Sequence, residues 1–200
     1  MYSSFGGDAP VELILYTDAL MTRGLVRTSQ HRVTDVLNHS DDAFLILEDV
    51  TVEELGHRGE TTRVEYAQVN LDAVLFAVSN VAVPSMPELR TRKEATEAVI
   101  SVPPFKIIGT IHLLPTEGNL RHGLTELTGR FLPVTDATFW SDPLGEARQQ
   151  ASMVAVNHRR AQILAPHRVV DPWADLDRPS AEPGAPTPPP DPAWPGDTVA

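Results

Sequence analysis

Short apolar stretches separated by turn residues fill the first 80 positions of the chain. They are rich in Val, Leu, Ile, Phe and Tyr, the residues that favour strands. The pattern predicts strands over 12–17, 20–27, 43–53, 63–70 and 73–79. Apolar positions 33, 36 and 37 have helical spacing, so 32–38 is expected to form a short helix or turn.

The third of these strands changes its pattern near the middle. Its first four apolar residues occupy both faces, as in a central strand, but Glu48 interrupts the face that Val50 and Val52 continue. A charged residue in an apolar line indicates a bulge or sharp bend beside Asp49. Pro133 indicates an edge or bulge in the second half, because proline cannot donate to a ladder. Short, strongly bent strands are typical of small barrels.

The chain repeats itself at an offset of about 87 residues, which indicates an internal duplication. In each copy a glycine precedes an apolar stretch, a Phe-Leu pair follows, an aspartate stands five residues after the phenylalanine, and a Val-Asn pair comes last. The second copy has two more residues between glycine and phenylalanine. The repeat positions are Gly24, Phe44, Asp49 and Asn70, followed by Gly109, Phe131, Asp136 and Asn157.

We interpret these repeat positions as structural. Asp49 and Asp136 could act as an acid–base pair if a cleft brought them together. A bulge aspartate that accepts backbone N–H bonds is the simpler interpretation. Asn70 and Asn157 are expected in turns, because asparagine tolerates the left-handed conformation.

These patterns predict a mainly β protein with two related, strongly bent small barrels. The copies are expected over 12–83 and 102–170, packed as a pseudo-twofold pair much as a homodimer would be. Residues 84–101 are expected to form a helical linker, because Ser85-Met86-Pro87-Glu88 is a capping box and an Ala- and Glu-rich stretch follows. The oligomeric state is open between a monomer with this internal pair and a higher oligomer.

Residues 171–200 form a tail of different composition. Nine of the 18 prolines lie there, with six acidic residues and one basic residue. Such a segment lacks backbone donors and apolar side chains, so the sequence predicts a disordered tail. The tail could act as a linear docking motif with an aromatic anchor, or its first tryptophan could pack back onto the folded part. The candidate docking residues are Trp173, Pro186, Pro189 and Trp194.

Composition excludes several classes of function. The chain has no cysteine, so it has no disulfide, thiolate zinc site or cysteine nucleophile. Its net charge of −11 argues against general binding to nucleic acids or anionic membranes, although residues 12–83 carry −7 and residues 102–170 carry +2. No signal peptide is visible in the first ten residues, and no apolar run is long enough for a membrane span. We expect a cytoplasmic protein.

Motifs of catalytic or metal chemistry are missing from the sequence. The seven histidines form no zinc-like pattern, and the nearest approach to one is His122 four residues before Glu126. There is no Gly-x-Ser-x-Gly, no phosphate-binding glycine-rich loop and no dinucleotide fingerprint. We therefore expect no catalytic residues, no cofactor and no metal ion.

Two resemblances concern the fold. Segments 32–38, 44–49 and 69–70 resemble a bacterial family known only as a domain of unknown function, over 12–83 and more loosely over 104–166. More distantly, the first copy is similar to the bent-strand pattern of Sm-like barrels, which implies a small Sm-like or SH3-like barrel. Sm-like RNA binders have an arginine-glycine pair in the last turn, where this chain has Asn70-Leu71 and Asn157-His158. The resemblance to Sm-like barrels makes RNA binding an alternative function, although this chain lacks that arginine-glycine pair.

A third resemblance concerns a ligand. Arg23 and Arg27, followed by Asn38-His39-Ser40, resemble the signature of PilZ-type receptors for cyclic dinucleotides. Arginine suits this chemistry, because it clamps phosphates with two hydrogen bonds and stacks on bases. Here the interval is short, Ala43 stands where a glycine belongs, and the second copy lacks both elements. Arg23, Arg27, Asn38 and Ser40 are the candidate residues for this alternative of nucleotide or small-ligand sensing.

Taken together, these features predict a non-enzymatic interaction or scaffold module in a bacterial cytoplasm. The expected partner is another protein. The opposite net charges of the two copies would let them contact each other or bind different partner surfaces.

Overall fold

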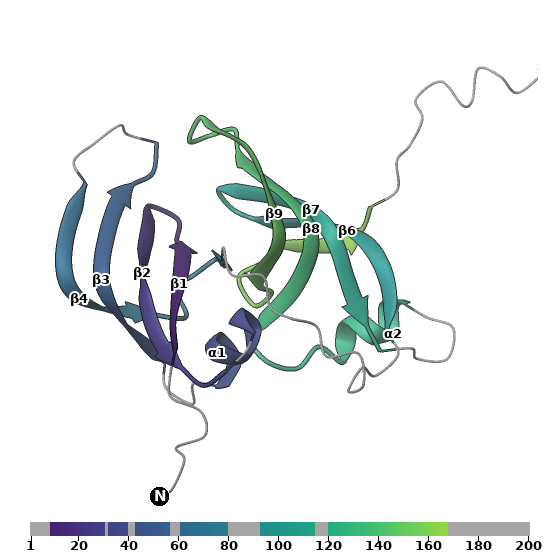
Figure 1. Ribbon diagram of the computed structural model, residues 1–200. Coiled ribbons are helices and arrows are strands. Elements are labelled where there is room, and N and C mark those ends of the chain that lie inside the picture. Colours follow the sequence, from purple (N-terminus) through teal and green to yellow (C-terminus); the bar gives the residue numbers. More distant parts are fainter. Residues whose placement is uncertain are drawn as a thin grey trace, which may run out of the picture. The chain divides into compact units, whose positions relative to one another are not determined.

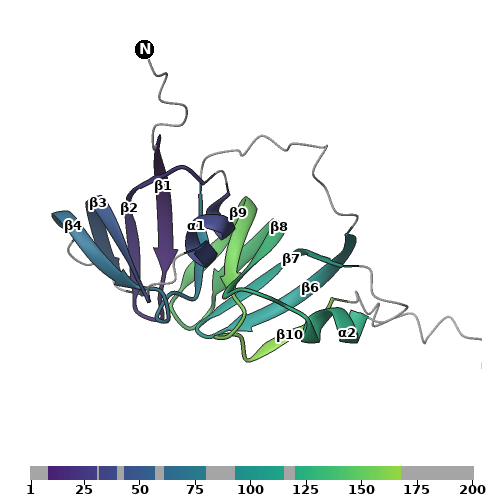
Figure 2. The same cartoon turned by 90° about the horizontal axis from the view of Figure 1, so that it is seen from below.

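The computed structural model describes residues 9–30, 32–39, 43–56, 61–79, 93–114 and 120–167. These residues form a mainly β protein with ten strands and two short helices (Figure 1). All strands belong to one antiparallel sheet, which is not closed. The strand order is β10-β6-β7-β8-β9-β5-β1-β2-β3-β4. The sheet therefore ends at β4 on one side and at β10 on the other (Figure 2).

The first repeat supplies one half of the sheet. Its elements are β1 (Ala9–Tyr16), β2 (Leu20–Thr28), α1 (Val33–His39), β3 (Phe44–Glu54), β4 (Thr62–Asn70) and β5 (Phe76–Val78). Strands β1 to β4 pair in chain order, and β5 returns to pair with β1. The five strands and the short helix predicted for this region are confirmed.

The second repeat has the same topology. Its elements are β6 (Glu94–Val102), β7 (Phe105–Leu113), α2 (Leu120–Thr125), β8 (Phe131–Ser141), β9 (Glu146–Asn157) and β10 (Ile163–Pro166). Strands β6 to β9 pair in chain order, and β10 returns to β6. The registers also correspond: Phe76 lies opposite Tyr16 in the first repeat, and Ile163 lies opposite Ser101 in the second. This agreement supports the internal duplication.

The helix predicted within 84–101 is wrong over its second part, because Glu94–Val102 forms β6. Ala98, Ile100 and Val102 are buried in alternation, and pairing with β7 overrides the helix propensity of Ala and Glu. The capping box lies outside the described residues. The second repeat thus begins at 94 rather than 102.

This new boundary changes the net charge of the second repeat. Residues 94–166 carry six basic and seven acidic residues, so both repeats are negative and the expected opposite net charges of the copies are wrong.

Each repeat bends at the aspartate that recurs in both repeats, as expected for the bulge beside Asp49. Asp49 and Asp136 have φ angles of 49° and 51°, in the left-handed region. On the neighbouring strand the register shifts by one residue at Gly24 and at Gly109. A Cβ atom on Gly109 would lie 2.7 Å from Val134 Cγ1, which is too close. Glycine and aspartate together therefore form the bend.

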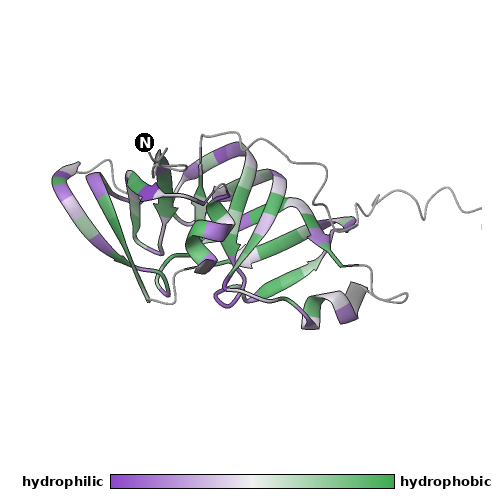
Figure 3. Cartoon of the chain, turned by 60° about the horizontal axis from the view of Figure 1, so that its bottom comes forward, coloured by the Kyte–Doolittle hydropathy of each residue, from purple (hydrophilic) through white to green (hydrophobic). Residues whose placement is uncertain are grey.

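The central strands are buried on both faces. Leu13 and Leu15 of β1 belong to one hydrophobic core, whereas Ile14 and Tyr16 belong to the other. Successive side chains of a strand point to opposite faces, so the two cores lie on opposite sides of β1. Figure 3 shows hydrophobic residues along these central strands. The core that contains Leu13 and Leu15 lies mainly in the first repeat, but it also includes Phe131 of the second repeat. The repeats therefore share their cores.

The repeats meet where β5 pairs with β9, which we call the β5–β9 junction. Ala77 lies opposite Ala155, and Asn157 N donates to Leu75 O over 2.9 Å. β9 is the counterpart of β4, and β5 is the counterpart of β10, so the junction joins non-equivalent strands. A twofold axis would pair equivalent strands. The expected pair of barrels about a pseudo-twofold axis is not confirmed, because the sheet is open and the repeats join head-to-tail.

The glycine at the second bend can be tested by substitution. We expect Gly109→Ala to lower the free energy of unfolding by about 1–3 kcal/mol, because its Cβ would collide with Val134 and the backbone of Thr135. Gly123→Ala is the control: its Cβ meets only the Leu113 side chain at 3.3 Å, and alanine favours helix, so we expect a change under about 1 kcal/mol. Urea unfolding measures both. Equal effects would contradict the packing account.

Candidate functional site

The outer side of the first repeat combines an edge strand with exposed apolar side chains. Among the described strands, β4 is the last of the sheet and pairs only with β3. Beside it, Phe44 is 47% exposed, Ile46 55%, Val64 41% and Tyr66 67%. We call these four side chains, together with the outer backbone of β4, the β4 edge.

The same position in the second repeat is covered. Phe131, the counterpart of Phe44, is 1% exposed and packs in the core of the first repeat. The backbone of β9, the counterpart of β4, pairs with β5. Exposure at the β4 edge therefore arises because no described strand lies beyond β4, while its counterpart has a neighbour.

A hollow of about 360 Å³ lies close to the β4 edge. It is lined by Leu20, Val52, Glu54 and Thr62. Leu20 is 36% exposed, and Val52 is partly buried. The lining joins two apolar side chains to a carboxylate and a hydroxyl, so it suits an apolar side chain better than an anion.

Asn38, a candidate ligand residue, joins the two repeats instead. Its Oδ1 accepts hydrogen bonds from Arg130 N at 2.8 Å and Phe131 N at 2.7 Å, and its Nδ2 donates to Phe131 O at 2.8 Å. Arg130 Nε lies 3.3 Å from Asp72 Oδ1, a further link between the repeats. Both polar atoms of the Asn38 amide thus hold α1 against the start of β8.

Asn70 and Asn157 each stabilise a turn, as expected, but they do so through a side-chain hydrogen bond and not through a left-handed backbone. Asn70 Oδ1 accepts from Asp72 N at 2.9 Å, and Asn157 Oδ1 accepts from Arg159 N at 3.2 Å. Neither asparagine has a positive φ, so the side chain rather than a left-handed backbone forms the turn. Asn157 is also buried, and its Nδ2 donates across the junction to the carbonyl oxygens of Val74 at 2.9 Å and Leu71 at 3.4 Å.

The other candidate ligand residues are not gathered around a common centre. Arg23 and Arg27 are exposed on β2, four residues or roughly 13 Å apart along the strand. Arg27 Nε lies 3.1 Å from Glu48 Oε2 in an exposed ion pair. Binding a phosphate through Arg27 or Asn38 would break a contact of the fold. Ser40 lies outside the described residues, as do Trp173, Pro186, Pro189 and Trp194.

The acids and histidines form no larger constellation in the described part of the chain. Asp49 and Asp136 each stand at the bend of their own repeat. His122 Nε2 lies 3.2 Å from Glu126 Oε1 in an exposed pair. Within the described ranges, no group of three or more His, Asp or Glu residues could hold a metal ion. No described helix is long and apolar enough to cross a membrane.

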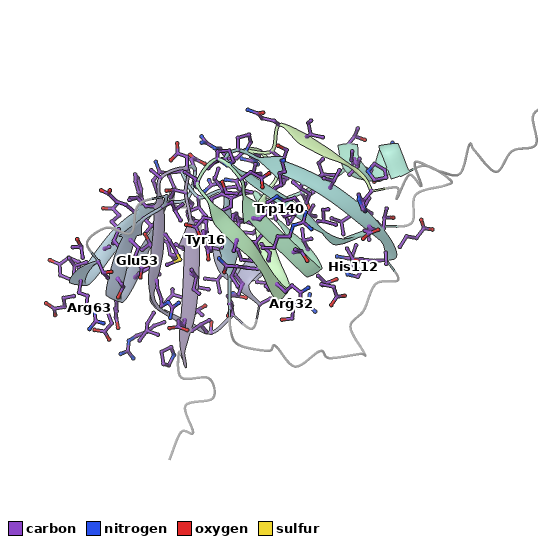
Figure 4. All side chains as sticks on the ribbon, turned by 90° about the horizontal axis from the view of Figure 1, so that it is seen from above. Tyr16, Arg32, Glu53, Arg63, His112 and Trp140 are labelled. Carbon is purple, nitrogen blue, oxygen red and sulfur yellow. The ribbon has the colours of Figure 1, made fainter. Side chains whose placement is uncertain are left out.

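Tyr16 is buried, and its hydroxyl has a raised pKa. Among the residues that the structure describes, no other buried titratable group has a raised pKa. Its ring stacks on Phe76 with centroids 4.4 Å apart and meets Phe105 and Phe139 edge-on at 5.6 Å. Burial raises the pKa of the Tyr16 hydroxyl, and Glu146 raises it further. Figure 4 shows Tyr16 towards the middle of the sheet and Arg63 at its outer end. The aromatic cluster joins both repeats.

The raised pKa predicts a loss of stability in alkali. In the unfolded chain Tyr16 ionises near its ordinary pKa of about 10, while the folded chain keeps the proton, so stability falls as pH rises past that value. We expect Tyr16→Phe to reduce this fall, whereas Tyr66→Phe at an exposed site leaves it unchanged. Urea unfolding between pH 8 and pH 11 measures it. An equal alkaline fall in wild type and Tyr16→Phe would contradict the assignment.

The comparisons with known proteins add no name to these features. No family model, no curated protein and no solved structure matches the chain. The resemblances of the sequence segments to known families therefore stay predictions.

Proposed function

We propose that the protein is a non-enzymatic interaction module of the cytoplasm that binds another protein through the β4 edge. The carrying observation is the set of four exposed apolar side chains on and beside β4, an edge strand of the described sheet. Exposed apolar patches and free strand edges both mark sites of protein association. An extended segment of the partner would add a strand to the sheet at β4.

The backbone of β4 supports this mode of binding. Leu71 N donates to Ala43 O, so the alternate residues 67 and 69 direct their backbone groups towards β3. Gln68 and Asn70 then direct theirs outward. These groups supply the hydrogen bonds that an added strand needs, and the flanking side chains supply apolar area.

β4 also lacks the usual protection of an edge strand over half of its length. Natural edges are commonly blocked by lysine, proline or a bulge. Here the charged residues, Arg63 and Glu65, stand near the beginning of β4, and 66–70 contains no charge and no proline. One basic and one acidic residue give a poor electrostatic footprint for nucleic acid. A protein strand is the better fit.

A photo-crosslinking amino acid at position 66 tests the proposal. Introduced in place of Tyr66 in cells, it should form adducts with a protein that mass spectrometry can identify. The control places the same group at Gln149, which is exposed on β9. We expect position 66 to form adducts with a specific protein, and we expect position 149 to form no adduct with that protein. Absence of any adduct at 66, or the same adducts at both positions, would contradict the proposal.

A further inference from the structure

We infer that the partner at the β4 edge is a second copy of this chain, with β4 of one copy paired with β10 of the next. This inference rests on the proposed function and names its partner. It repeats between chains the arrangement that the β5–β9 junction makes within one chain. Chains would then associate head-to-tail.

The duplication makes the two outer edges complementary. The junction pairs β5 of the first repeat with β9 of the second. β4 corresponds to β9, and β10 corresponds to β5, because the strand orders of the two repeats are the same. The described sheet therefore ends in the two strand types that it already joins at its centre.

The correspondence fixes a register. Phe76 lies opposite Val156 at the junction, so Ile163 of one chain should lie opposite Val69 of the next. In the same way Leu164 should lie opposite Gln68. His167 N donates to Glu97 O, so Leu164, three residues earlier, directs its backbone groups away from β6. Gln68 and Leu164 can then exchange two hydrogen bonds, as Ala155 and Ala77 do.

One exposed side chain of β10, that of Ile163, fits the hollow beside β4. Phe76 is fully buried, with its ring centroid 5.0 Å from that of Phe105 and 5.1 Å from that of Phe139. Its counterpart Ile163 is 58% exposed. The counterparts of Phe105 and Phe139 are Leu20 and Val52, which line the hollow. Ile163 of one chain would therefore enter the hollow of the next.

Asn70 offers a further repeated contact. Its counterpart Asn157 donates from Nδ2 to the carbonyl oxygens of Leu71 and Val74 across the junction. Both asparagines hold the same turn through Oδ1. By correspondence, Asn70 Nδ2 would donate to the carbonyl oxygens of His158 and Ala161 of the next chain.

Two contacts of the junction are not repeated. Thr125 stands where α1 has Asn38, and its hydroxyl donates to His122 O. Ala43 stands where the second repeat has Arg130, so the ion pair with Asp72 has no counterpart. The contact between chains should thus be weaker than the junction and reversible. Since each chain has both edges, association should continue past a dimer, into a ring if the rotation closes and a filament if it does not.

The mass of the purified full chain tests the assembly. We expect sedimentation velocity to show species larger than a dimer that increase with concentration. Ile163→Asp should leave a monomer, because the carboxylate of Glu54 in the lining of the hollow repels a second carboxylate and the apolar contact of Ile163 is lost. Leu114→Asp is the matched control: Leu114 is 51% exposed but lies on neither edge, so this variant should assemble. A wild-type chain that stays monomeric at every concentration would overturn the inference, as would equal loss in both variants.

Disulfide trapping tests the register. The chain contains no cysteine, so Val69→Cys and Ile163→Cys each introduce a single thiol. Mixed and oxidised, the two variants should form a crosslinked pair of one chain of each, while neither variant alone should crosslink. The offset pair Gln68→Cys with Ile163→Cys should react far less. Crosslinking of Val69→Cys with itself would show pairing of β4 with β4 and overturn the head-to-tail arrangement. Circular dichroism confirms that each variant is folded.

These results separate the two levels of the proposal. A monomeric, uncrosslinked chain whose position 66 forms specific adducts with a different protein would overturn self-assembly and leave the interaction function standing. Adducts between copies of this chain support both. Absence of any adduct, together with a monomeric chain, would remove both.

Discussion

The pairing of β5 with β9 is the constraint on which the rest of the structure depends. β5 has only three residues, and it lies between β1 and β9. Ile14 and Tyr16 on β1 are buried in the core of the second repeat. Without the junction these side chains would face water, and Phe131 would lose its place in the first core. The two repeats are thus parts of one folding unit, whose central strands need partners on both faces.

The bends in each repeat follow from a pair of residues on neighbouring strands. A left-handed aspartate on the third strand inserts one residue into the ladder, and a glycine on the second strand makes room for it. The same pair occurs in both repeats, although Asp49 is flanked by Glu48 and Asp136 by Thr135. The two aspartates therefore recur in the sequence because each forms a bend of the backbone, and not because they act as an acid–base pair.

Much of the fold could be predicted from the sequence, because local patterns determine it. Stretches rich in Val, Leu, Ile, Phe and Tyr predict the strands of the first repeat, and Glu48 indicates the bend. β6 was missed because Ala and Glu favour helix, while its strand conformation depends on pairing with β7. The open sheet and the role of Asn38 could not be predicted either. Phe44 and Phe131 occupy the same repeat position, yet only their neighbours in space decide that one is exposed and the other buried.

The most direct test of the account is amide hydrogen exchange at the β5–β9 junction, measured by NMR in the dilute protein. If the junction holds the two repeats together, the amides of Ala77 and Ala155 exchange only through global unfolding, as slowly as core amides such as that of Leu47. The outer amides of Gln68 and Leu164 should exchange faster. If Ala77 and Ala155 exchanged as fast as these edge amides while Leu47 stayed protected, the repeats would be independent, and the account would be contradicted.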